Sequence, residues 1–412
     1  MRLTRIAIAP IEPGLLRACA ARSGYLIESP DELRAGFGAI VASLELPGGI
    51  ADTADTEAFF RNLTLDGDEG PRGTGVVAFA SLPFDRTQPG RLDVVALTIS
   101  QFGDGRAWLT TAEGAPSIFD FIEDVSPPSQ ETQSAVRLAY EPSGESYARS
   151  VAKAVDLLHE SALDKVVLGR SVEGTVHDAL DPAAVAHRLR RRETTSTIYA
   201  LPTPGGRYVG ASPELLVARI GSTAACHPLA GTIALPERDE HDDYTKWLLS
   251  SGKNLHEHAI VVDDIASMLR PLYNLVEADQ QPSIVPLRTL AHLGSWVRAS
   301  RLDAGPSPTA LSLLSLLHPS AAVGGLPRTR ATQVLRDLEG VDRGHFAGPV
   351  GWIDSDGDGD WWVGIRGVLL SDNHFRAWAG AGIVAESDPV AERQETRDKL
   401  ASILAAVLID HI

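Results

Sequence analysis

The chain is poor in cysteine, with only Cys19 and Cys226 among its 412 residues. Two cysteines provide neither a disulfide framework nor a thiolate metal site, and a reducing cytoplasm is therefore the expected location. Basic residues are also few, since 37 lysines and arginines face 54 aspartates and glutamates, for a formal net charge of −17. A nucleic-acid binder needs a basic surface, so we expect no nucleic-acid partner.

Long apolar runs and phosphate-binding loops are also absent from the sequence. No window approaches the roughly 18 uninterrupted apolar residues of a membrane-spanning helix, so we expect no membrane association. Residues 1–13 lack the apolar core of a signal peptide. No glycine-rich loop of the Rossmann or P-loop type is found, which argues against a nucleotide-binding fold of those classes.

What the chain does contain is enough apolar sequence, 44%, for a substantial core. Short β-like runs cover residues 75–80 and 92–98 and are separated by the turn-rich segment 83–90. Further strands are expected at 165–170 and, as a strand pair, at 208–210 and 215–218. Strands that follow one another as hairpins predict an α/β (α+β) fold with mostly antiparallel sheets and flanking helices, rather than a doubly wound sheet.

Three helices are predicted from apolar spacing. Tyr147, Val151, Ala154 and Leu158 recur on one face of a helix that leads into the strand at 165. A long helix is expected over 243–271, and a last one over 391–410. Residues 124–146, rich in serine, proline, glutamate and glutamine, are the expected surface connection.

The two later helices each present carboxylates on one face. Asn254 and Glu257 are spaced i, i+3, and Glu392, Glu395 and Lys399 are spaced i, i+3, i+7. One carboxylate from each helix, together with an anionic substrate group, would suit Mg²⁺. The alternative is two solvated faces with Glu395 and Lys399 as an ordinary surface pair, and spacing alone leaves both open.

Two other segments look like metal motifs but have the wrong spacing. His256 and His258 are two residues apart, whereas helical zinc ligands are four apart. The acidic run from Asp354 to Asp360 resembles the start of a calcium loop, but the closing glutamate position of such a loop is Ile365. We expect a hairpin turn there, between strands at 352–353 and 361–363.

Single residues suggest acid–base chemistry and anion binding. Glu214 enters an apolar run after Ser212 and Pro213, and burial there would raise its pKa and suit a general acid. Lys165 would serve as an amine base if desolvated, although an exposed strand end explains either residue equally well. Arg366 suits a bidentate grip on a carboxylate, and the glycines around Gly380 would let backbone N–H groups approach an anion.

Taken in order, these segments resemble the chorismate-utilising enzyme family. The matching stretches are 165–170, 210–216, 228–232, 253–258, 292–295, 317–325, 348–352, 380–384 and 392–396. The resemblance covers the chain from about residue 147 to its end, and it implies one enzyme domain over 1–412. Residues 1–146 would be its more variable portion and 147–412 its catalytic core, with antiparallel sheets packed face to face and helices outside.

The resemblance also implies the reaction and the residues that perform it. Chorismate would be the substrate, Mg²⁺ the cofactor and isochorismate the product, in a monomer without a glutamine amidotransferase subunit. Lys165 would activate water for attack at C2, and Glu214 would protonate the departing C4 hydroxyl. The implied metal residues are Glu257, Glu395 and Glu392, and the implied substrate-contacting residues are Gly231, Thr232, His292, Ala322, Arg366, Gly380 and Lys399.

Several positions bear on the branch of the family. A lysine at 165 goes with enzymes that activate water rather than ammonia, and Ala230 stands where aminodeoxychorismate synthases carry a nucleophilic lysine. Ala322 and Phe346 are more like siderophore-type isochorismate synthases than salicylate synthases, which tend to have threonine and tyrosine there. The segment 292–295 is similar to salicylate synthases, so that activity remains an alternative, as does a catalytically silent protein of this fold.

Overall fold

The computed structural model describes residues 1–51, 56–123, 128, 134–160, 163–235, 241–302 and 307–408. Its strands are β1(Arg2–Ile8), β2(Tyr25–Glu28), β3(Glu32–Leu46), β4(Thr64–Gly67), β5(Val77–Ser81), β6(Gly90–Phe102), β7(Ala107–Ala112), β8(Arg137–Glu141), β9(Lys165–Thr175), β10(Thr197–Thr203), β11(Gly206–Ser212), β12(Leu215–Ile220), β13(Thr223–His227), β14(Leu229–Ala234), β15(Leu275–Ala278), β16(Ser283–Pro286), β17(Leu290–Gly294), β18(Val297–Ser300), β19(Gly325–Leu326), β20(Pro349–Asp354), β21(Gly359–Val363), β22(Gly367–Ser371) and β23(His374–Ile383). Its helices are α1(Pro13–Ser23), η1(Gly49–Ala51), α2(Thr56–Arg61), α3(Phe119–Ile122), α4(Gly144–His159), α5(Pro182–Arg192), α6(His241–Ser250), α7(Gly252–Leu269), α8(Ala310–Leu317), α9(Arg328–Leu338) and α10(Pro389–Val407).

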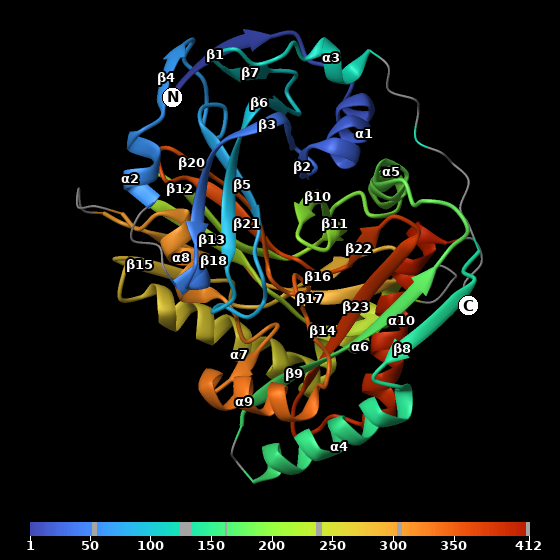
Figure 1. Ribbon diagram of the computed structural model, residues 1–412. Coiled ribbons are helices and arrows are strands. Elements are labelled where there is room, and N and C mark those ends of the chain that lie inside the picture. The colour runs from blue at the N-terminus through green and yellow to red at the C-terminus, as the bar shows by residue number, and fades with distance from the viewer. Residues whose placement is uncertain are drawn as a thin grey trace.

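The strands form one long, almost wholly antiparallel ladder that folds back on itself (Figure 1). One arm runs β8-β9-β23-β22-β11-β10-β2-β3-β6. From β6 the other arm continues through β5-β20-β21-β12-β13-β18-β15. A separate small sheet joins β14, β17 and β16. The predicted fold class is confirmed, because hairpin-connected strands pair with their neighbours along the chain.

The two arms enclose a common hydrophobic core. Phe79 of β5 belongs to one arm, Tyr199 and Tyr208 belong to the other, and all three are fully buried in the same cluster. Tyr25 of β2, in the same arm as Tyr199 and Tyr208, has its ring centroid 5.6 Å from that of Phe79. Burying apolar surface between two sheet faces is the main source of stability for such layers.

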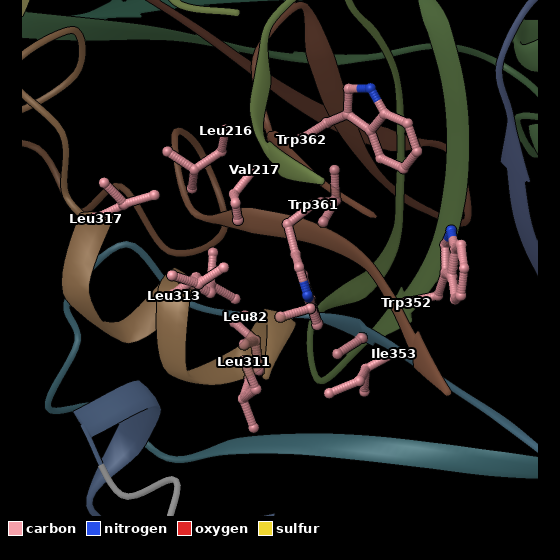
Figure 2. Close-up of a cluster of buried hydrophobic side chains, with 14 of the residues drawn as sticks. Leu82, Leu216, Val217, Leu311, Leu313, Leu317, Trp352, Ile353, Trp361 and Trp362 are labelled. Carbon is pink, nitrogen blue, oxygen red and sulfur yellow. The ribbon is translucent and has the colours of Figure 1, made fainter. Parts of the chain in front are cut away.

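Helices cover the outside of the ladder. Helix α8 lays Leu313 and Leu317 against the strands that carry Val217 and Trp361, as Figure 2 shows. Helix α10 packs on β23 and on α4, and α9 packs on β9 (Figure 1). These contacts surround the lower end of β9 with helices on both sides. No helix among the described residues is long and apolar enough to cross a membrane.

The predicted helices are found, with one correction. Helix α4 contains the expected apolar face, and α10 spans the last prediction as far as Val407. The single helix expected over 243–271 is wrong, because it divides into α6 and α7 at Ser251. Ser251 has extended backbone angles and its Oγ accepts a hydrogen bond from the Asn254 N–H, so it caps a new helix.

Two strand predictions also need correction. Strands β11 and β12 exist, but they do not form the expected pair, since β11 lies between β10 and β22 while β12 lies between β13 and β21. The connection expected over 124–146 lies partly outside the described residues, and its later part contains β8, which pairs with β9. The expected hairpin turn is confirmed between β20 and β21, where Asp354 accepts the N–H groups of Asp356 and Asp358.

Candidate active site

Lys165 is the first residue of β9 and is fully buried. On one side it pairs with Leu326 of β19, and on the other the ladder continues to β23. Its Nζ atom lies 3.1 Å from Oε1 of Glu257 on α7. Gly382 of β23 makes room for this contact, since a Cβ there would lie 2.0 Å from the same Oε1 and 2.9 Å from Cε of Lys165.

A cavity opens beside this pair, where β9, β14, β17 and β23 meet α7 and α10. All the predicted site residues except Lys165 and Glu392 line it, namely Glu214, Gly231, Thr232, Glu257, His292, Ala322, Arg366, Gly380, Glu395 and Lys399. Its apolar wall includes Val167, Phe346 and Trp378. A concave, mostly apolar site with a few converging polar groups is typical of small-molecule pockets.

Glu214 occupies the break between β11 and β12. The Ser212 hydroxyl accepts the Glu214 N–H and donates to the carbonyl of Val363 at 2.6 Å, which fixes the turn. Burial raises the pKa of the Glu214 carboxyl to about 7, and the charge of Lys165 and a hydrogen bond from the Leu229 N–H act in the opposite direction. Near neutral pH this group therefore exists partly as the acid, which a proton donor requires.

A β-bulge at Gly231 places the side chain of Thr232 at the cavity. Gly231 has φ of +71°, and the register of β14 against β17 shifts between Ala230 and Thr232. A Cβ at Gly231 would also press on Asn254 of α7, 3.0 Å away. Glycine meets both demands, and the extra residue turns Thr232 toward His292 on β17.

Thr232, His292 and Arg366 form a continuous polar chain along the cavity. Oγ1 of Thr232 lies 3.0 Å from Nδ1 of His292, and Nη2 of Arg366 lies 3.0 Å from Nε2 of the same ring. Burial, followed by the charges of Arg366 and Lys399, lowers the pKa of His292 well below its ordinary value. Arg366 itself sits at φ +51°, and burial lowers its pKa to about 10, so it remains a cation at neutral pH.

The acidic residues of α10 take two different positions. Glu395 lines the cavity and accepts from Lys399 Nζ at 2.6 Å, while Lys399 also donates to the carbonyl of Gly380 at 2.9 Å. Glu392 is buried behind this pair and is bound by Lys253 of α7. Burial and the neighbouring Glu395 raise the pKa of Glu392 to about 7, against the lowering effect of Lys253.

The donor set is suited to a hard cation. Within the described residues, no group of three or more histidine, cysteine, aspartate or glutamate side chains is arranged as a protein-only metal site. Magnesium is commonly held by one or two carboxylates, waters and a substrate anion, and the cavity offers Glu257 and Glu395 from two helices. The two histidines near Glu257 are not partners in such a site, because His256 is exposed and His258 contacts Ser295.

Arg343 is a cavity residue that sequence reasoning missed. Its guanidinium donates to the carbonyls of Val167 and Val323 at 2.6 and 2.7 Å, and to both oxygens of Glu339 at 2.7 Å. It thereby joins the strand of Lys165 to the loop that carries Ala322. A lone arginine after a helix gives no sequence signal for this role, because the two carbonyls come from distant segments.

Residues 53–408 match the sequence family described as chorismate binding enzyme. The match covers most of the chain, so the chain belongs to the chorismate-binding enzyme family.

Its relatives point to one activity within that family. Isochorismate synthase DhbC of Bacillus subtilis is 37% identical over 280 residues, which is 66% of this chain and 70% of the relative. The vibriobactin-specific isochorismate synthase of Vibrio cholerae is 36% identical over 285 residues, 69% and 72% of the two chains.

The solved structures agree on the architecture. MenF, the menaquinone-specific isochorismate synthase from Escherichia coli, superposes with a TM-score of 0.82 and covers 98% of this chain and 94% of its own. At 24% sequence identity this likeness establishes the fold alone. The alternation of antiparallel arms and outer helices described above is therefore the architecture of this family.

Proposed function

We propose that the protein is an isochorismate synthase that interconverts chorismate and isochorismate. The observation that carries the proposal is the placement of Glu214, a buried carboxyl with its pKa raised to about 7, on the cavity wall near the charge of Lys165. The reaction needs one group that donates a proton and one that accepts a proton, and different surroundings allow two groups to take these two roles. Two relatives that match 66% and 69% of this chain bear the name isochorismate synthase.

The proposed step moves one hydroxyl group into the ring and one out. For this step Lys165 must be the neutral amine, so the proton that it holds in the ion pair with Glu257 has to leave before the reaction. The amine then takes a proton from water while the water oxygen bonds to C2 of chorismate. The ring double bonds shift, the bond from C4 to its hydroxyl breaks, and Glu214 gives its proton to the departing oxygen, which leaves as water. Return of the proton from the Lys165 ammonium to the Glu214 carboxylate restores the enzyme, and the sequence is reversible.

The remaining cavity groups would hold the substrate. Arg366 and Lys399 supply positive charge for its carboxylates, and the backbone at Gly380 and Gly231 allows close approach. Glu257 and Glu395 would hold Mg²⁺, with Glu392 behind them. When bound, the ion would neutralise these carboxylates and hold a substrate carboxylate in place.

Water as the nucleophile removes the need for a subunit that supplies ammonia. We therefore propose that the protein acts without an amidotransferase partner. We also propose that it is a cytoplasmic monomer. Ala322 and Phe346 line the cavity without hydroxyl groups, which favours release of isochorismate over further elimination of pyruvate.

Isotope transfer tests the chemistry. Turnover of chorismate in water labelled with heavy oxygen should give isochorismate with the label in its C2 hydroxyl. Isochorismate without label would contradict attack by water, and label in recovered chorismate would report the reverse step. Lys165→Met, incubated in the same way, is the matched control and should incorporate no label.

A further inference from the structure

The hydrogen bonds that link Thr232, His292 and Arg366 have fixed donors and acceptors. Nη2 of Arg366 lies 3.0 Å from Nε2 of His292, and a guanidinium carries only donors. Nε2 must therefore accept, which means that it bears no proton in this arrangement. The ring is left with Nδ1 as the only nitrogen that can hold one.

The charge state of the ring agrees with this assignment. His292 is buried, and its pKa is lowered well below the ordinary value by burial and by the charges of Arg366 and Lys399. A backbone contact with Gly231 has the opposite effect, as expected for a carbonyl that faces a ring N–H. The neutral ring thus carries one proton, and the contact of Arg366 with Nε2 leaves that proton on Nδ1.

The consequence falls on Thr232. Its Oγ1 lies 3.0 Å from Nδ1, and the hydroxyl cannot donate to this nitrogen, because a protonated ring nitrogen has no lone pair with which to accept. The threonine hydroxyl then keeps its own proton, and this hydrogen bond to His292 does not use it. Thr232 lines the cavity together with Arg366 and Lys399, so its O–H remains available to a ligand bound there.

We propose that Arg366, acting through His292, fixes the Thr232 hydroxyl as a hydrogen-bond donor to a carboxylate oxygen of the substrate. His292 is then a positioning residue and not an acid or base. Nε of Arg366 is buried without a hydrogen-bond partner among the described residues, so the same guanidinium retains a donor beyond the one given to His292. The identity of the substrate rests on the proposed function, whereas the position of the proton does not.

The proton position can be measured without turnover. In protein labelled with nitrogen-15 at histidine, the imidazole signals of His292 should show a protonated Nδ1 and an unprotonated Nε2, and a His292→Gln sample assigns them. A proton on Nε2, or a doubly protonated ring at neutral pH, would overturn the proposal.

The donor role can be tested by binding. Calorimetry with chorismate should show a loss of affinity of about tenfold or more for Thr232→Val, which keeps the shape and removes the hydroxyl. Thr232→Ser keeps the donor and should lose clearly less. Equal losses in the two variants, with both folded by circular dichroism, would contradict the donor role.

The two proposals fail differently. A wild-type protein that binds chorismate with this pattern of variants and this tautomer, yet makes no isochorismate, would disprove the proposed function and leave the donor role intact. If Thr232→Val does not fold, the wild-type tautomer and the affinity of Thr232→Ser decide the question.

Discussion

Nζ of Lys165 and Oε1 of Glu257 are 3.1 Å apart, with side chains 1% and 10% exposed. The contact joins the first residue of β9 to the second turn of α7, and the absence of a side chain at Gly382 leaves space for it. An ion pair this well buried is strongly sensitive to the loss of either partner. The residue proposed as the base and a carboxylate proposed for the metal are therefore one structural unit.

Loss of either proposed proton-transfer group should remove turnover without removing the fold. Lys165→Met and Glu214→Gln are each expected to lower kcat by at least about a hundredfold, because general acid–base groups contribute at that level or above. Initial rates with chorismate, alongside near-ultraviolet circular dichroism, measure this. Rates near wild type in either variant would show that the assigned role is wrong.

The pH dependence should report Glu214. Burial raises its pKa to about 7, and only the protonated form can donate, so the rate should fall as pH rises through about 7. The same raised pKa makes its contribution to stability complete below its ordinary value of 4.5 and lost as pH rises through about 7. Urea unfolding of the wild-type protein and of Glu214→Gln across this pH range compares their free energies of unfolding. If the two free energies change with pH in parallel, the raised pKa is contradicted.

Gly382→Ala should disrupt the contact between Lys165 and Glu257. The added Cβ would lie 2.0 Å from Oε1 of Glu257, so the carboxylate must move from its place against the lysine. We expect a loss of activity of at least about tenfold, of the kind that follows small displacements of catalytic groups. Gly252→Ala is the matched control, because a Cβ there has no atom within 4 Å, and its activity should be unchanged.

Arg343→Lys should destabilise the protein and lower its rate of turnover. An ammonium cannot replace the fork that binds Val167, Val323 and Glu339, and at least one buried acceptor would be left without a donor. The expected loss of unfolding free energy is about 2 kcal/mol or more, measured by urea denaturation. Arg106→Lys, at an exposed pair with Asp104, should have almost no effect.

Local features of the fold were predictable from the sequence. The apolar spacing of residues 147–158 predicts α4, and the acidic run after residue 352 predicts the turn between β20 and β21, since both signals come from neighbouring residues. The division of the long helix at Ser251 had a local signal as well, a serine followed by glycine, but apolar spacing continues across it. The pairing of β11 and β12 with other strands had none, because it is decided by residues far along the chain.

The site was predictable as a set of positions and not as a set of contacts. Residue chemistry suggested Glu214 and Arg366, resemblance to a known family added His292, and the cavity contains all three. Nothing in the spacing indicated that Lys253 would bind Glu392, or that Arg343 would join two cavity segments. Such contacts depend on tertiary approach, since Lys253 and Glu392 are 139 residues apart and Arg343 and Val167 are 176 apart.

Product analysis tests the central claim most directly. Purified protein is incubated with chorismate and Mg²⁺, and the products are separated by chromatography while pyruvate is measured in parallel. We predict isochorismate in equilibrium with chorismate and no pyruvate. Salicylate with an equal amount of pyruvate would move the chain to the salicylate synthase branch, and unchanged chorismate would contradict an isochorismate synthase altogether.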